Sequence, residues 1–156
     1  MDKKDLKFIH NTIIHWIDKT DTKANIFLGI QLVILGYVVS HFRNLNLGIC
    51  YKKIILDFLL FLTILVFFFI FKIIWPRLST NEPKSFIYFK HIYNRYVKNK
   101  QQATEDFSKI SKQEFENDLI NQVVSLSTVA TTKYTDLQKM ILILGIEIIL
   151  IIVLFI

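Results

Sequence analysis

An apolar stretch long enough to cross a lipid bilayer directly follows a charged segment near the start of this chain. Residues 24–42 contain no Asp, Glu, Lys or Arg, and a helix rising about 1.5 Å per residue would carry them roughly 28 Å, about the thickness of a hydrocarbon core. No proline interrupts residues 6–42, and apolar residues recur every three or four positions through 6–20, which is the helical period. The sequence predicts an amphipathic helix that continues without a break into the membrane.

Two further apolar stretches complete the predicted membrane part. Residues 54–75 form the second and end at Pro76, which stops a helix. We expect residues 43–53 to be a short turn before it. The third, residues 141–156, follows a helical periodicity that starts near Ser111 and Glu114, spaced as in a capping box. We expect one helix of about 40 residues there, half in water and half in lipid.

The predicted fold class is therefore an all-α membrane protein with about three transmembrane helices and a cytosolic helical insert. Hydrophobic residues make up 53% of the chain, which is unusual for a soluble protein. In the insert we expect a loop at 76–84, a helix from Ser85 to about residue 98, and a polar connection at 99–104. The next helical piece starts at either Thr104 or Ser111. The four expected segments are a cytosolic amphipathic helix at 1–23, a transmembrane hairpin at 24–75, a cytosolic helical region at 76–139 and a C-terminal transmembrane helix at 140–156.

The distribution of basic residues predicts the orientation. Eleven of the 19 Lys and Arg residues lie between Lys72 and Lys139, and cytoplasmic segments carry an excess of such residues. We expect the N-terminus and residues 76–139 in the cytoplasm and the C-terminus outside. An alternative has two spans and an incompletely crossing third helix, because residues 141–156 are short and contain Glu147.

Several kinds of chemistry find no support in the sequence. The single cysteine, Cys50, excludes an intrachain disulfide and a multi-cysteine zinc site. His10 and His15 are five residues apart, about 140° around a helix, and so do not share a metal on one face. There is no phosphate loop or nucleophile elbow. We expect no enzyme activity, catalytic residue, cofactor or metal, and we assign the net charge of +6 to cytoplasmic segments rather than to nucleic-acid binding.

Polar residues inside the predicted spans are candidates for function. Gln31 and Glu147 form either a polar interface that lines a water path in an oligomer or hydrogen-bonded contacts that hold helices together. At the membrane entry, Asp21, Lys23 and Ala24 form either a coupling junction or a boundary with locally paired charges. In the insert we expect an aromatic face to be part of the core rather than a platform for stacking bases. Its residues are Phe86, Tyr88, Phe89, Tyr93 and Tyr96.

Three blocks of sequence, in this order and spacing, are similar to those of one protein family. They are residues 11–28, with Trp16 and Asp21-Thr-Lys-Ala24; Pro76 followed by Ser85-Phe-Ile-Tyr-Phe-Lys-His-Ile92; and Asp118-Leu-Ile-Asn-Gln122 continuing to Lys133-Tyr134. Together they cover most of the chain and resemble the small transmembrane effectors of the bacterial Pycsar antiphage system. The Asp-x-Lys-Ala opening resembles that family's signature at the first span.

The resemblance implies a function that the residue patterns alone do not. It implies an inner-membrane protein that responds to a cyclic pyrimidine mononucleotide, cyclic CMP or cyclic UMP, made by a partner nucleotide cyclase, and that then disrupts the membrane in an abortive infection. Its blocks supply the candidate residues for ligand binding or a cytosolic interface, which are Ser85, Phe86, Phe89, Gln122 and Lys133. No phosphate cassette of the β-roll type occurs in the sequence.

Two further expectations concern partners. We expect a homo-oligomer embedded in membrane lipids, because Gln31 and Glu147 exposed to lipid would be costly and identical copies would cover both. The alternative function is a constitutive membrane scaffold or accessory subunit that anchors a cytosolic partner through residues 76–139.

Overall fold

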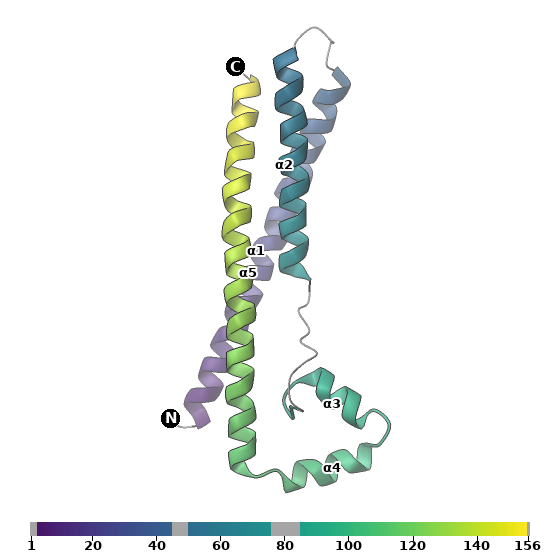
Figure 1. Ribbon diagram of the computed structural model, residues 1–156, viewed down its shortest axis with the longest axis vertical. Coiled ribbons are helices and arrows are strands. Elements are labelled where there is room, and N and C mark those ends of the chain that lie inside the picture. Colours follow the sequence, from purple (N-terminus) through teal and green to yellow (C-terminus); the bar gives the residue numbers. More distant parts are fainter. Residues whose placement is uncertain (1–2, 45–49, 76–84, 156) are drawn as a thin grey trace. The chain divides into compact units, whose positions relative to one another are not determined.

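The computed structural model describes residues 3–44, 50–75 and 85–155, and all regular structure within these ranges is helical. The predicted all-α fold class is confirmed. Figure 1 shows the order of the elements along the chain, which are α1 (Lys3–Asn44), α2 (Cys50–Ile74), α3 (Phe89–Tyr96), α4 (Lys100–Lys109) and α5 (Lys112–Phe155).

Three of these helices are long and apolar enough to cross a membrane, with candidate spans inside Lys4–Phe42, Lys52–Ile74 and Lys112–Leu154. The prediction of two long helices without a break is confirmed, since α1 has 42 residues and α5 has 44. A helix of that length extends more than 60 Å, about twice the hydrocarbon core. A bilayer core is therefore long enough to cover only part of each of these helices.

The chain divides into two compact units. We call Asp18–Pro76 with Thr132–Ile156 the span unit, and Met1–Ile17 with Arg77–Thr131 the insert unit. Two of the three boundaries along the chain fall inside continuous helices, one in α1 and one in α5. The backbone of these two helices therefore belongs to both units.

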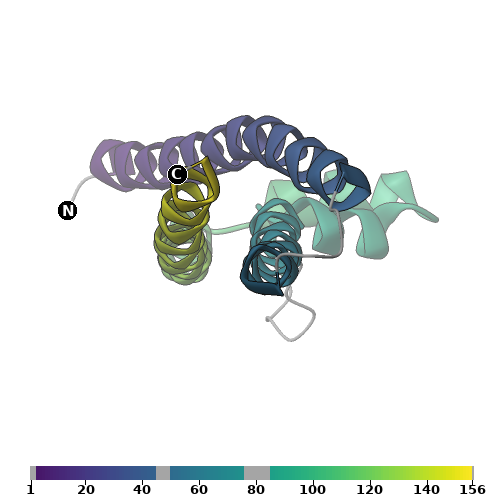
Figure 2. The same ribbon diagram turned by 90° about the horizontal axis from the view of Figure 1, so that it is seen from above.

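In the span unit, α1, α2 and α5 pack around two apolar clusters. Figure 2 shows the three helices from above, with α1 blue in this part, α2 dark teal and α5 yellow. Because lipid tails are as apolar as these side chains, the clusters stabilise the bundle by close packing rather than by removal from water. The first cluster contains Ala24, Val66, Ile70, Ile73, Leu137 and Met140, and the second contains Ile34, Val38, Leu56 and Leu59.

Large apolar side chains also cover the outer faces of the three spans. Val33 of α1, Phe68 of α2 and Leu142 of α5 are all well exposed in the isolated chain. A helix that is apolar on its inner and outer faces is typical of a membrane span rather than of a surface helix. The packing therefore agrees with the lengths and composition of the spans.

The insert unit differs from the prediction in its two short helices. Residues 99–104 are not a polar connection, because α4 begins at Lys100 and the Asn99 side chain caps it by accepting a hydrogen bond from the Gln102 amide at 3.3 Å. Ser85 does not cap α3 either. The N-cap of α3 is Tyr88, without a side-chain cap, and the helix ends two residues earlier than expected.

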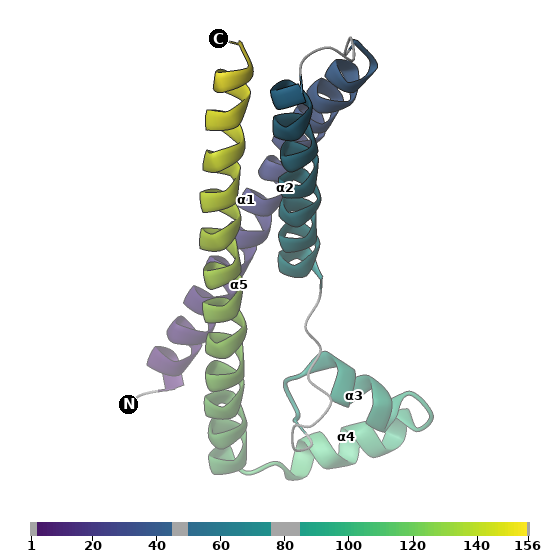
Figure 3. The ribbon, with the colours of Figure 1, turned by 45° about the horizontal axis from the view of Figure 1, so that its top comes forward.

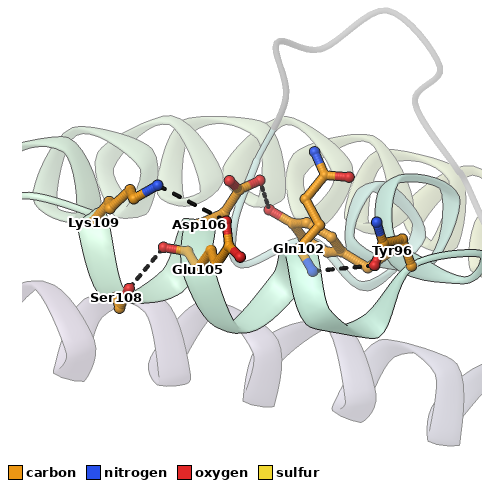
Figure 4. Close-up of polar contacts among 7 residues, drawn as sticks. Tyr96, Gln102, Glu105, Asp106, Ser108 and Lys109 are labelled. Carbon is orange, nitrogen blue, oxygen red and sulfur yellow. Dashed lines mark hydrogen bonds and ion pairs between the residues drawn. The ribbon is translucent and has the colours of Figure 1, made fainter.

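The α3 and α4 helices are joined by a buried tyrosine. Figure 4 shows the Tyr96 hydroxyl directed at Asp106 of α4, to which it donates a hydrogen bond of 2.9 Å. Burial, and to a lesser extent this hydrogen bond, raises the pKa of the Tyr96 hydroxyl above 10.0. The group therefore stays protonated and acts as a donor. The ring of Phe107 lies 5.9 Å from that of Tyr96. The inner face of α3 is therefore fixed on α4.

The remaining element boundaries agree with the sequence except near the predicted hairpin. The capping box is confirmed, since the Ser111 amide donates to Glu114 at 2.9 Å and the Glu114 amide donates to the Ser111 hydroxyl at 3.1 Å. Helix α1 continues to Asn44 and α2 begins at Cys50, so residues 50–53 are helical and not part of a turn. Residues 45–49 and the predicted loop at 76–84 lie outside the described residues.

Candidate functional site

Two ion pairs connect α5 to the other two spans within the span unit. The Lys133 ammonium on α5 donates to the Asp21 carboxylate on α1. Three residues further along α5, Asp136 accepts from Lys72 of α2, with 3.0 Å between Nζ and Oδ1. The α5 partners are the more deeply buried, with side chains of Lys133 and Asp136 exposed by 5% and 3%. We call these four side chains the junction charges.

The two pairs have opposite polarity, and this follows from the order of residues along α5. Lys133 and Asp136 are three apart, so they lie about one turn along the same side of the helix. One faces an acid on α1 and the other a base on α2. The four junction charges sum to zero, which lowers the cost of burying charge near an apolar core.

The residues beside Asp21 contact the same part of α5. The Lys23 ammonium lies 5.9 Å from the centre of the Tyr134 ring, within the range of a cation–π contact. Ala24 is fully buried in the cluster with Leu137 and Met140. The interpretation of Asp21 as a locally paired charge is wrong, because its partner Lys133 is 112 residues away in the chain.

A second polar contact joins all three spans inside the apolar bundle. Gln31 Nε2 of α1 and Thr63 Oγ1 of α2 both donate to Glu147 Oε1 of α5, at 3.0 and 2.9 Å. All three side chains are 0% exposed. We call them the polar triad. Because hydrogen-bonded polar groups hold helices together in lipid, the triad fixes α5 against both other helices.

The triad also corrects one premise of the sequence analysis. Gln31 and Glu147 do not need identical copies to cover them, because α1, α2 and α5 of one chain already bury both. Among the described residues, two atoms of the triad, Gln31 Oε1 and Glu147 Oε2, have no hydrogen-bond partner. Self-association stays a prediction, but lipid exposure of these side chains no longer supports it.

In the insert unit, Ser85 connects the segment before α3 to α5. Its hydroxyl accepts hydrogen bonds from the Tyr88 amide at 2.9 Å and the Gln122 side chain at 3.1 Å, and donates to Asp118 at 3.0 Å. Asp118 also accepts from the Phe86 amide at 2.7 Å. This arrangement is a side-chain mimic of a turn, anchored on one face of α5.

The five candidate residues for ligand binding do not form one cluster. Ser85, Phe86 and Gln122 come together in the insert unit, while Phe89 is 66% exposed on α3. Lys133 belongs to the span unit, where it pairs with Asp21. Any role of these residues in ligand binding stays a prediction.

The sequence analysis missed several residues of these contacts. They are Thr63, Lys72, Asp118 and Asp136. Of these, Lys72 is paired although its side chain is 43% exposed. Within the described ranges, no group of three or more His, Cys, Asp or Glu side chains is placed to hold a metal ion.

The fold and these contacts define an all-helical membrane protein with three candidate spans, in which one long helix is tied to the other two by charged and polar side chains. The Pycsar effector protein domain matches residues 5–156, so the chain belongs to the Pycsar effector family and the resemblance is confirmed. Its role is that of an effector in antiphage defence. No curated protein and no solved structure matches the chain.

Proposed function

We propose that this effector responds to a cyclic nucleotide by rearranging or self-associating its spans, and that it thereby disrupts the inner membrane and aborts infection. The nucleotide is a cyclic pyrimidine mononucleotide, cyclic CMP or cyclic UMP, made by a partner nucleotide cyclase. The observation that supports this proposal is the attachment of α5 to both other spans, through the junction charges and the polar triad. A shift of α5 would change all of these contacts together.

The energetics of the bundle favour such a change. Apolar packing in lipid has no hydrophobic driving force behind it, so a few polar contacts carry much of the preference for one arrangement. Each contributes roughly 0.5–2 kcal/mol in a membrane. A ligand that favours a second arrangement by about 5.5 kcal/mol reverses a population ratio of 1:99. Binding to the insert unit would supply this preference through the continuous backbone of α5.

Leakage from proteoliposomes tests the proposal. The full chain is reconstituted with a self-quenched dye inside, and cyclic CMP, cyclic UMP, cyclic AMP, cyclic GMP and cyclic oligonucleotides are added separately. We expect dye release with a cyclic pyrimidine mononucleotide, none from protein-free vesicles, and recovery of the nucleotide intact. Vesicles that stay sealed with every nucleotide, while the chain binds a cytosolic protein, would instead favour the scaffold function.

We further propose a cytoplasmic N-terminus and an external C-terminus, on the distribution of basic residues. In intact spheroplasts, Cys50 should react with a membrane-impermeant maleimide added outside. In a Cys50→Ser background, a cysteine at Lys100 should react only after the membrane is opened. The reverse pattern would assign the opposite orientation.

A further inference from the structure

An apolar stripe on α3 faces away from the rest of the insert unit. Phe89, Tyr93 and Val97 repeat every four residues and so share one face of the helix. They are exposed by 66%, 64% and 48%. The prediction that this aromatic face belongs to the core is therefore wrong for Phe89 and Tyr93, whereas Tyr96 at the C-terminal end of α3 is buried.

Contacts at the C-terminal end of α3 hold this helix in place. Figure 3 shows α3 and α4 as neighbouring helices in the insert unit, and the Tyr96–Asp106 hydrogen bond joins them. The Phe107 ring of α4 lies edge-on to Phe86, with 5.8 Å between ring centres. The Arg95 guanidinium covers the Phe86 ring at 4.9 Å. With its C-terminal end held in this way, α3 leaves Phe89 and Tyr93 exposed.

The charged residues within the segment that contains the stripe have one sign. Residues 85–104 contain no Asp or Glu, and their basic residues are Lys90, Arg95, Lys98 and Lys100. The acids that follow on α4 are engaged, Glu105 with Lys109 and Asp106 with Tyr96. A short helix with aromatic residues on one face and lysines beside them is typical of segments that lie at the surface of anionic membranes.

We propose that this face of α3 docks on the anionic headgroups of the membrane that the spans cross. The inference goes beyond the proposed function and does not depend on it. Chain connectivity keeps the surface within reach, because α3 begins 15 positions after the end of α2 at Ile74 and extended chain covers roughly 3.5 Å per residue. A second copy is less suitable, since it would bring the same positive charge against the stripe. Phe89 and Tyr93 insert between headgroups while Lys90 and Lys98 contact phosphate.

The depth of a probe at position 93 tests this docking in the full chain. A Tyr93→Cys, Cys50→Ser variant carries an environment-sensitive dye and is reconstituted in neutral vesicles or in vesicles with about 30 mol % anionic lipid. Lipids with a spin label near the headgroup quench the dye only if it enters the interface. We expect a blue-shifted emission and at least about twofold more quenching in the anionic vesicles. A dye on Gln101→Cys, an exposed α4 position, should remain in water in both.

Matched charge variants identify the cause of the docking. Lys90→Gln with Lys98→Gln should remove most of the difference between anionic and neutral vesicles. Lys109→Gln with Lys112→Gln lowers the net charge by the same amount on the same unit. Its lysines belong to α4 and α5, so the difference should persist. Emission of an aqueous dye at position 93 in both vesicle types would overturn the proposal. A dye that is protected from water only at high protein-to-lipid ratios would also overturn it, because that result would assign the stripe to contact with a second copy.

Discussion

Lys72 of α2 and Asp136 of α5 pair at 3.0 Å, and Asp136 lies three residues from Lys133, which pairs with Asp21 of α1. Rotation of α5 by one residue, about 100°, would break both pairs together. The opposite polarity of the pairs also excludes a simple exchange of partners, because α1 supplies an acid and α2 a base. The junction charges therefore fix the rotation of α5 relative to both other spans.

Reversal of the Lys72–Asp136 pair should separate its charge contribution from its packing. Asp136→Lys or Lys72→Asp alone places like charges together and should destabilise the span unit by about 1–3 kcal/mol. This loss is smaller than for a fully buried pair, because the Lys72 side chain is partly exposed. The double variant should recover most of this loss. Melting of all three variants in detergent is followed by the fluorescence of Trp75, which belongs to the span unit.

An exposed pair provides the control. Lys112 and Glu116 on α5 are four residues apart with 3.8 Å between their charged atoms, and their exchange should change stability by less than about 0.5 kcal/mol. If the double variant at Lys72 and Asp136 melts no higher than the single variants, the pair does not act through charge complementarity.

Removal of either partner of the Asp21–Lys133 pair should have unequal effects. Asp21→Ala leaves the ammonium of Lys133 almost fully buried without its partner, and should cost about 2–4 kcal/mol. Lys133→Met leaves the Asp21 carboxylate, whose side chain is 33% exposed, in partial contact with water and should cost less. Lys23→Ala removes only a cation–π contact and should cost under about 1 kcal/mol. Equal losses in all three variants, measured by the same melting assay, would contradict this order.

The start of α5 should respond to pH through Glu114. Hydrogen bonds from the backbone amide of Ser111, and then from its hydroxyl, lower the pKa of the Glu114 carboxyl below 4.5. A lowered folded-state pKa gives stability that is fully present above 4.5 and is lost as the pH falls through the folded value. Amide exchange at residues 112–116 should therefore accelerate, relative to its intrinsic rate, only as the pH falls below 4.5. Glu114→Gln has no titrating group, and its exchange should show no such added loss.

The elements that the sequence predicted are those that local patterns specify. The periodicity through residues 6–20, the long apolar runs and the Ser111 capping box each depend on neighbours within one helix, and α1 and α5 formed as expected. The first half of helix α4 was not predicted, because Phe107 is the one large apolar side chain among its ten residues. Its start was nevertheless marked by Asn99, a common cap residue, before the helix formers at 100–103.

The contacts between helices were much harder to predict. The pairing of Asp136 with Lys72, or of Glu147 with Thr63, depends on how helices more than 60 residues apart are rotated against one another. One sequence does not contain that rotation in any local pattern. The sequence contained a partial indication. Lys133, Asp136 and the buried Met140 are spaced three and four residues apart and so share one face of α5, where unpaired charges would be costly.

The polar triad should depend on hydrogen bonding at Glu147 rather than on a negative charge there. Glu147→Gln keeps the shape and an oxygen that accepts from Thr63, and should retain folding and ligand-triggered leakage. Glu147→Leu removes the acceptor of both hydrogen bonds and leaves Gln31 and Thr63 unpaired in an apolar bundle, which should cost about 1–3 kcal/mol. Melting and leakage of the two variants are compared. Failure of both variants alike would show that the ionised carboxylate is itself required.

Transmission of a signal along α5 should require a rigid helix at the boundary between the units. The boundary falls between Thr131 and Thr132, inside a helix without interruption. A Gly-Gly pair at these positions lowers helix stability by about 1 kcal/mol per residue relative to Ala and leaves the junction charges and the polar triad in place. This variant should insert in the membrane and bind nucleotide, yet lose most ligand-triggered leakage.

An Ala-Ala pair at the same two positions is the matched control. It removes the same hydroxyl groups, including the hydrogen bond from Thr131 to the Ser127 carbonyl, but restores the best helix former. Leakage should therefore be retained in the alanine variant and lost in the glycine variant, with equal nucleotide binding in both. If the glycine variant leaks as fully as the alanine variant, the insert unit does not act on the spans through α5, and α1, the other helix shared by both units, becomes the remaining continuous path.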